Sequence, residues 1–211
     1  MSAYKNPKKR KFNISIGILL FLVQAFVLVK ADLFFPADQI GSWRTSIIIY
    51  MVLQASMYAI PDLRNRLFNV SPKDYLVKLL ISSVLTFGIL SFGLSSVVGD
   101  IFGALATLSF SSLMIIVFYH IYVASIEQPF FFWFLKDKMH FGIFGAALVF
   151  AVFHILFTTT LFIFMSYFLL ALIFIFIQKQ FSPKTGAVNT GVHAGYDVFK
   201  EGLIQLRSVV Q

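Results

Sequence analysis

Long apolar runs are the feature that most constrains what this chain can fold into. They cover residues 12–31, 43–60, 76–98, 101–135 and 140–179. About 20 apolar residues in an α-helix cross the hydrocarbon core of a bilayer, whereas a transmembrane barrel shows alternating segments of about ten residues. The runs here are longer and continuously apolar. The sequence therefore predicts an all-α fold, a polytopic transmembrane helical bundle with about six to seven membrane helices.

The composition favours the same class and limits the chemistry. Of 211 residues, 59% are hydrophobic and 12% are charged, and the mean hydropathy is +0.86; an ordinary soluble domain is about 25% charged. The chain has no cysteine, which excludes disulfides, thiolate metal sites and a cysteine nucleophile. Much of the net charge of +8 lies in the N-terminal segment and the short loops. In a membrane protein, basic residues in these places usually set the topology and contact anionic lipid. The charge therefore does not indicate nucleic-acid binding.

The basic residues also predict the orientation of the chain. Residues 1–11 form a basic flank that we expect in the cytoplasm, followed by a single transmembrane helical domain over residues 12–211. The connection 32–42 carries aspartates and no basic residue, so we expect it outside, whereas the basic connection 62–75 is expected in the cytoplasm. The later basic loops fall on the same side. We therefore expect a multi-pass integral membrane protein with a cytoplasmic N-terminus.

Two apolar stretches are too long for one helix. At 1.5 Å per residue the stretch 101–135 would reach roughly 50 Å, against about 30 Å of hydrocarbon. It must tilt, kink or break, and Pro129 is the obvious place for a kink. Residues 140–179 suffice for two spans with a hairpin at 158–160. The last element, from Ala187, is either a half-helix or a longer helix that continues towards the C-terminus; the sequence leaves both open.

Four ionisable residues lie in sequence that is otherwise fit for lipid: Glu127, His154, His193 and Asp197. Ionisable groups at membrane depth cost about 2.5–3.5 kcal/mol each on insertion scales and usually mark functional sites. Counted along helices from the nearest basic loops, Glu127 and His193 lie roughly 13 Å deep and His154 roughly 24 Å deep. His193 and Asp197 are four residues apart and face the same way on a helix. These depths permit one shared pocket reached from the cytoplasmic side.

Structural explanations exist for each group taken alone. A membrane histidine often only hydrogen-bonds a neighbouring carbonyl, and a lone glutamate can satisfy a contact between helices. Asp197 can lie at the membrane interface, solvated by water. His120, two turns before Glu127, is either a partner of the four groups or a neighbour of Tyr119 with no further role. His140 is expected at the membrane interface. The phenylalanines at 130–132 are expected to face lipid or to pack against other helices.

Taken together, these residues resemble the CPBP family of intramembrane proteases, the CAAX-protease and bacteriocin-processing group. The family pattern is EExxxR, then FxxxH, then HxxxN. Phe150 and His154 match the second motif, and His193 opens the third. In the first motif Glu127 is followed by Gln128 in place of the second glutamate, and Phe132 stands where the arginine belongs. The third motif ends in Asp197 in place of asparagine.

The resemblance implies an intramembrane endopeptidase that needs no cofactor or metal. Glu127 with one histidine would activate a water for attack on a peptide carbonyl, and the other histidine with residue 197 would stabilise the oxyanion. The implied substrate is a lipidated or membrane-embedded peptide. An ionised Asp197 cannot donate to an oxyanion as asparagine does; a neutral one can.

The departures from the family pattern favour a second function, a catalytically inactive relative kept as a structural or assembly subunit among partner membrane subunits. A third hypothesis is that these residues bind a metal ion, because two histidines and a carboxylate are a plausible ligand set for iron or zinc.

Overall fold

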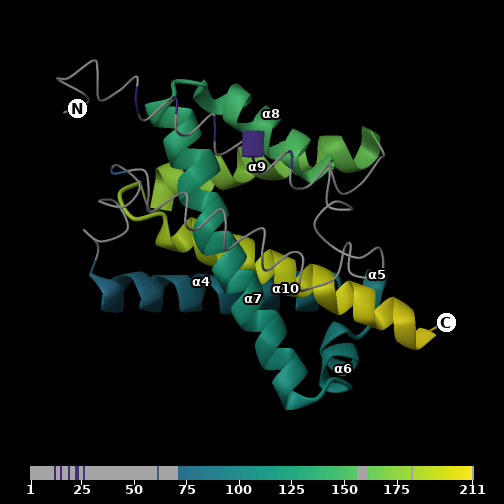
Figure 1. The fold of residues 1–211 in the computed structure, drawn as a ribbon. Coiled ribbons are helices and arrows are strands. Elements are labelled where there is room, and N and C mark those ends of the chain that lie inside the picture. The colour runs from purple at the N-terminus through teal and green to yellow at the C-terminus, as the bar shows by residue number, and fades with distance from the viewer. Residues whose placement is uncertain are drawn as a thin grey trace. The chain divides into compact units, whose positions relative to one another are not determined.

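The structure, a computed structural model, describes residues 71–155, 161–181 and 183–210, together with isolated positions between residues 12 and 61. The described residues contain helices and no strand, which confirms the all-α class. The elements are α4 (Pro72–Gly93), α5 (Ser95–Val98), α6 (Ile101–Ala106), α7 (Phe110–Pro129), the π-helix η3 (Phe130–Lys138), α8 (Gly142–Ile155), α9 (Leu161–Phe181) and α10 (Ala187–Val210) (Figure 1).

Three of these helices are long and apolar enough to cross a membrane: α4, the continuous helix Phe110–Lys138, and α9. The apolar helix in α8, Gly142–His154, is shorter. The chain is therefore a membrane protein by the length and composition of its helices. The predicted spans 12–31 and 43–60 lie outside the continuously described residues. The total of six to seven spans and the cytoplasmic N-terminus accordingly stay predictions.

The predicted interruption of the stretch 101–135 is confirmed, but it falls between α6 and α7 and not at Pro129. Polar side chains begin both helices. The Asp100 carboxylate accepts a hydrogen bond from the Gly103 amide at 2.8 Å, and the Ser109 hydroxyl accepts one from the Ser112 amide at 3.2 Å. These bonds satisfy amides that a helix start leaves without partners.

At Pro129 the helix continues and changes its type. Proline has no amide hydrogen, so the α-helical ladder loses one bond at this residue. The nine residues that follow form the π-helix η3, whose wider turns are often found at functional sites. Glu127 and Gln128 therefore occupy the last α-helical turn before this change.

The described part of residues 140–179 forms two helices, α8 and α9, of which α9 is long and apolar enough to cross a membrane and α8 is shorter. The predicted hairpin at 158–160 lies outside the described residues. The last element is the longer of the two alternatives, because α10 continues without a break to Val210.

The chain divides into two compact units. The α10 unit comprises residues 70–129 and 173–211, and the phenylalanine-rich unit comprises residues 1–69 and 130–172. The expected single domain over residues 12–211 stays a prediction, and each unit is described by itself below.

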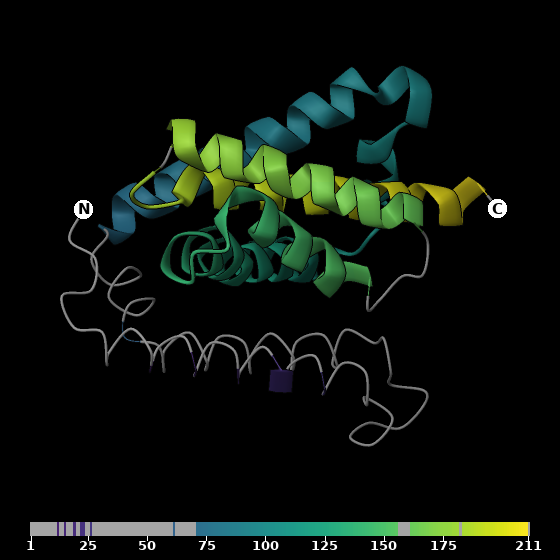
Figure 2. The same cartoon turned by 90° about the horizontal axis from the view of Figure 1, so that it is seen from above.

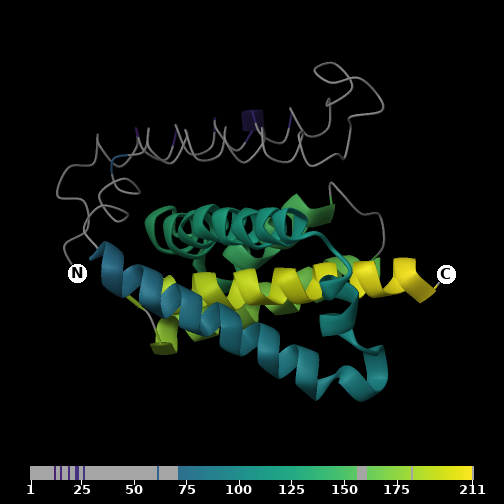
Figure 3. The ribbon, with the colours of Figure 1, turned by 90° about the horizontal axis from the view of Figure 1, so that it is seen from below.

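In the α10 unit, helix α10 packs against α4, α7 and α6. It runs along α4 and crosses α7 (Figure 1, Figure 3). After α4 the chain turns back towards α7 through α5 and α6 (Figure 2).

Two glycines of α10 allow the close approach. A Cβ added at Gly191 would overlap the Leu79 carbonyl, and one added at Gly195 would overlap the Ser83 carbonyl, both on α4. Small residues at such positions let the backbones of membrane helices meet. At 3.6 residues per turn, Asn189, His193 and Asp197 lie on the opposite side of α10 from these glycines. The glycines thus direct the polar residues away from α4.

In the phenylalanine-rich unit, η3 packs against α8. The Phe131 ring lies 5.3 Å from the rings of Phe150 and Phe153, and Phe132 lies 5.1 Å from Phe150. Phe130, Phe131 and Phe132 are completely buried. Of the two expectations for this run, packing against other helices holds.

Candidate functional site

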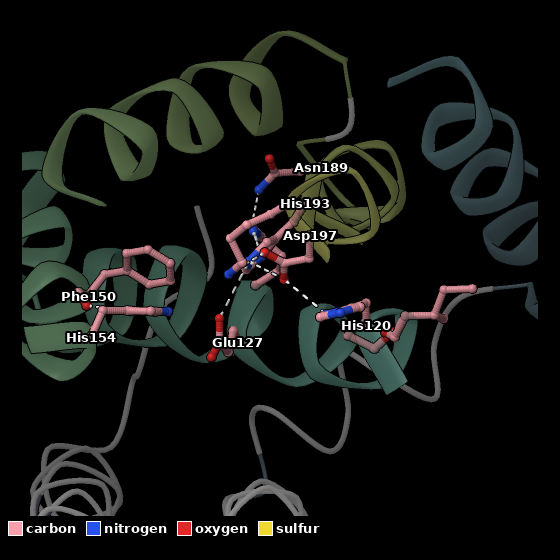
Figure 4. A network of polar contacts seen from close by, with 11 residues as sticks. His120, Glu127, Phe150, His154, Asn189, His193 and Asp197 are labelled. Carbon is pink, nitrogen blue, oxygen red and sulfur yellow. Dashed lines mark hydrogen bonds and ion pairs between the residues drawn. The ribbon is translucent and has the colours of Figure 1, made fainter. Parts of the chain in front are cut away.

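His193 on α10 is the centre of a buried polar cluster. Its Nε2 lies 3.6 Å from Oε2 of Glu127 on α7 and 3.4 Å from Oδ2 of Asp197, one turn further along α10 (Figure 4). All three side chains are buried, with exposed fractions of 2%, 1% and 6% in that order. The structure therefore brings together three of the four residues that the sequence selected.

The other ring nitrogen of His193 contacts an amide. Nε2 of Gln128 lies 2.7 Å from Nδ1 of His193. The Asn189 amide nitrogen in turn donates to Oε1 of Gln128. Gln128 and Asn189 are also buried, at 1% and 0% exposed. A chain of polar contacts thus runs from Asn189 through Gln128 and His193 to the two carboxylates.

The sequence alone indicated no role for Asn189, and Gln128 was only a departure from the first motif. A signal for Asn189 was present, because it precedes His193 by four residues and so lies on the same helical face. Nothing in the spacing indicated that the Gln128 amide would meet the same histidine.

Asp197 connects the cluster to further charged and titratable groups. Its Oδ2 lies 3.7 Å from Nδ1 of His120 on α7, and its Oδ1 lies 3.4 Å from Nζ of Lys200. Lys200 is 38% exposed. Of the two alternatives for His120, partnership with the four groups holds, and its ring also lies 5.3 Å from the ring of Tyr119. One buried carboxylate thus faces two histidines and a partly exposed lysine.

An aromatic ring packs against the central histidine of the cluster. The buried ring of Phe174, on the part of α9 that belongs to this unit, lies 4.5 Å from the His193 ring. In such surroundings electrostatic interactions are stronger than in water, and a polar atom without a partner is costly.

His154 belongs to the phenylalanine-rich unit. Its Nδ1 lies 2.9 Å from the carbonyl oxygen of Phe150, four residues earlier on α8, and its ring stacks on Tyr167 at 4.2 Å. The FxxxH pair is therefore a local contact along one helix. A meeting of His154 with the His193 cluster stays a prediction.

A metal centre is not favoured by the geometry. Within residues 71–155, 161–181 and 183–210, no group of three or more histidine, aspartate and glutamate side chains is arranged to hold a metal ion. His193 also has an amide at one ring nitrogen and carboxylates near the other.

A cavity of about 330 Å³ lies in the α10 unit, lined by residues of α4, α6, α7 and α10. Its walls are apolar except for Ser83. Val117 precedes His120 by one turn on α7, and Val198 directly follows Asp197 on α10, so the cavity wall and the polar cluster share two helices. Ligand sites are commonly apolar cavities with a few polar groups at their edge.

No protein-family model, curated protein or solved structure matches this chain.

Proposed function

We propose that the protein is a CPBP-like intramembrane endopeptidase whose water-activating pair is Glu127 and His193. The observation that carries the proposal is the 3.6 Å separation of Oε2 of Glu127 from Nε2 of His193, with both side chains almost completely buried in a helical membrane protein. Buried carboxylates paired with histidines are costly to keep in such a protein and usually have a function.

In the proposed reaction, Glu127 is the general base. It accepts a proton from a water held at its carboxylate and at His193, and the water oxygen forms a bond to the peptide carbonyl carbon. When the resulting tetrahedral intermediate collapses, the carbon–nitrogen bond breaks. Glu127 then returns the proton to the leaving amine, so the enzyme ends in its starting state.

The oxyanion requires a hydrogen-bond donor, and Asp197 is poorly suited to that task. Its oxygens already face Lys200 and two histidines. We therefore assign the donor role to the His193 ring, with Asp197 orienting that ring. His154 is proposed as a second contributor, as the motif resemblance implies.

The substrate in this proposal is a peptide with a membrane-embedded or lipidated segment. The apolar cavity on the same helices supports this class, because its wall offers apolar surface on α7 and α10, the two helices that carry the reacting groups.

The test uses purified protein in liposomes with two quenched fluorogenic probes, a single-span membrane peptide and a peptide with a prenylated cysteine. Glu127→Gln removes the base without changing the shape of the side chain, and should lower cleavage by about 10²-fold or more. The matched control is Glu201→Gln, the same change at a half-buried position of α10 that pairs with Gln205. Unchanged cleavage in both Glu127→Gln and His154→Ala would end the proposal.

A second function is favoured by two specific positions. Gln128 replaces a family carboxylate and is engaged in an internal amide network, and Phe132 replaces the family arginine and is completely buried against Phe150. An inactive structural subunit of a membrane complex would show these features. It predicts partner subunits that co-purify in mild detergent, and Glu127→Gln should leave them bound. A protein that purifies alone and cleaves either probe contradicts this alternative.

A further inference from the structure

We propose that Gln128 and Asn189 are positioning residues that keep His193 neutral, with its proton on Nε2 and directed at Glu127 and Asp197. The consequence for catalysis rests on the proposed endopeptidase function. The position of the proton itself does not.

Nδ1 of His193 faces an amide nitrogen. An amide nitrogen is a donor and cannot accept a hydrogen bond. Because Nε2 of Gln128 faces Nδ1 of His193 at 2.7 Å, that ring nitrogen must be the acceptor. A neutral imidazole with an accepting Nδ1 carries its proton on Nε2.

Asn189 orients the Gln128 amide. A glutamine can turn either its oxygen or its nitrogen towards a histidine, and the rest of its contacts decide. Here the Asn189 amide nitrogen donates to Oε1 of Gln128, which leaves the glutamine nitrogen for His193. Oδ1 of Asn189 has no hydrogen-bond partner in the described part of the chain. Asn189 thus leaves its own oxygen buried without a hydrogen bond in that part of the chain, which is unfavourable, while its nitrogen fixes the orientation of the Gln128 amide.

Nε2 of His193 faces two carboxylates. Carboxylate oxygens of Glu127 and Asp197 lie 3.6 and 3.4 Å from it. A lone pair on Nε2 would be repelled by both oxygens, whereas an N–H group is attracted to them. The groups facing the Asp197 side are His120 and Lys200. The amide pair and the carboxylates therefore favour the same tautomer from opposite sides of the ring.

This arrangement gives a function to a residue that departs from the motif. With the proton on Nε2, His193 presents a donor to the water or the oxyanion beside Glu127. With the proton on Nδ1, it would present a lone pair instead, and the donor would be lost. Histidine tautomers set by a hydrogen bond at the other ring nitrogen are a general device of acid–base sites.

The experiment is ¹⁵N NMR of the full-length protein in lipid nanodiscs, with labelled histidine and the His193 signals assigned by their loss in His193→Phe. We expect a directly bonded proton on Nε2 and an unprotonated Nδ1 in the wild type at neutral pH. A wild-type ring with its proton on Nδ1 overturns the inference.

Two variants test the positioning pair. Asn189→Leu frees the Gln128 amide to rotate, so the two tautomers should interconvert and the His193 signals should broaden or double. Gln128→Glu replaces the donor by an acceptor and should place a proton on Nδ1. The control is Thr190→Val, a buried neighbour on α10 whose hydroxyl meets Tyr75; it should leave the His193 signals in place. Unchanged signals in both Asn189→Leu and Gln128→Glu would remove the positioning role.

Activity provides an independent readout. If the protein is an endopeptidase, Asn189→Leu should lower kcat by about tenfold or more with little change in KM, as supporting residues typically do. A protein that cleaves neither probe but holds its proton on Nε2 keeps this inference and loses the proposed function. A protein that cleaves a probe but holds the His193 proton on Nδ1 keeps the proposed function and loses this inference.

Discussion

The packing of α10 on α4 leads to a sharp prediction for Gly191→Ala. The added Cβ would overlap the carbonyl oxygen of Leu79 and lie 3.0 Å from its carbonyl carbon, whereas ordinary contact begins near 3.4 Å. Backbone atoms cannot rotate away as a flexible side chain can. The two helices must therefore separate by roughly 1 Å at this point, which weakens the dispersion contacts along their interface.

The magnitude can be isolated with a second glycine. Gly88 lies within α4 and has no atom of the described residues within 4 Å of an added Cβ. Both substitutions gain up to about 1 kcal/mol from the higher helix propensity of alanine. That gain cancels in the comparison, so the difference between the variants measures the clash. Overpacking costs about 1–3 kcal/mol, and Gly191→Ala should be less stable than Gly88→Ala by that amount.

The assay is unfolding in mixed micelles with increasing SDS, followed by far-ultraviolet circular dichroism of wild type and both variants. Gly88→Ala should equal or exceed the wild type in its unfolding midpoint, and Gly191→Ala should fall below it. The displacement also moves His193, two residues further along α10. The activity of Gly191→Ala should therefore fall by more than its loss of folded protein explains. Equal midpoints for the two variants would refute the close packing of α10 on α4.

Three further predictions use the same unfolding assay. Asp100→Ala removes the side chain that caps α6 and should cost about 1 kcal/mol, whereas Asp74→Ala, which breaks only an exposed ion pair, should cost a few tenths; equal losses would contradict the capping role. Phe131→Ala empties a completely buried position and should cost about 3–5 kcal/mol, against a small change for Phe144→Ala at a 72% exposed position. His154→Phe keeps an aromatic ring beside Phe150 and Tyr167 and removes the hydrogen bond to the Phe150 carbonyl, so about 1 kcal/mol should be lost; a much larger loss would indicate contacts beyond that bond.

Local patterns in the sequence were enough to select most of the candidate site. Glu127, His193 and Asp197 stood out because ionisable groups are rare in apolar stretches, and the spacing of His193 and Asp197 placed them on one face of a helix. The helical class followed from the length of the apolar runs. These inferences depend only on the cost of charge in lipid and on the period of a helix.

Other features depended on contacts between segments that are distant in the chain. After the break, α7 begins at the Ser109 hydroxyl, which accepts a hydrogen bond from the Ser112 amide, while Pro129 changed the helix type without ending the helix. From the sequence, Gln128 was interpreted only as the loss of a family carboxylate. In the structure its amide contacts His193, which lies 65 positions further along the chain. The FxxxH match correctly placed His154 on a helix, but a sequence motif does not determine which other helix the histidine ring contacts.

What the sequence determined by itself was therefore which residues share a face of one helix, because that follows from 3.6 residues per turn. Which face meets which helix was decided by the tertiary structure. On α10 the glycines at 191 and 195 admit the backbone of α4, and the polar residues on the other side, His193 among them, meet Glu127 and Gln128 of α7 as a consequence. The physical reason is that close packing of two backbones fixes the rotation of a helix, and that rotation places every other side chain it carries.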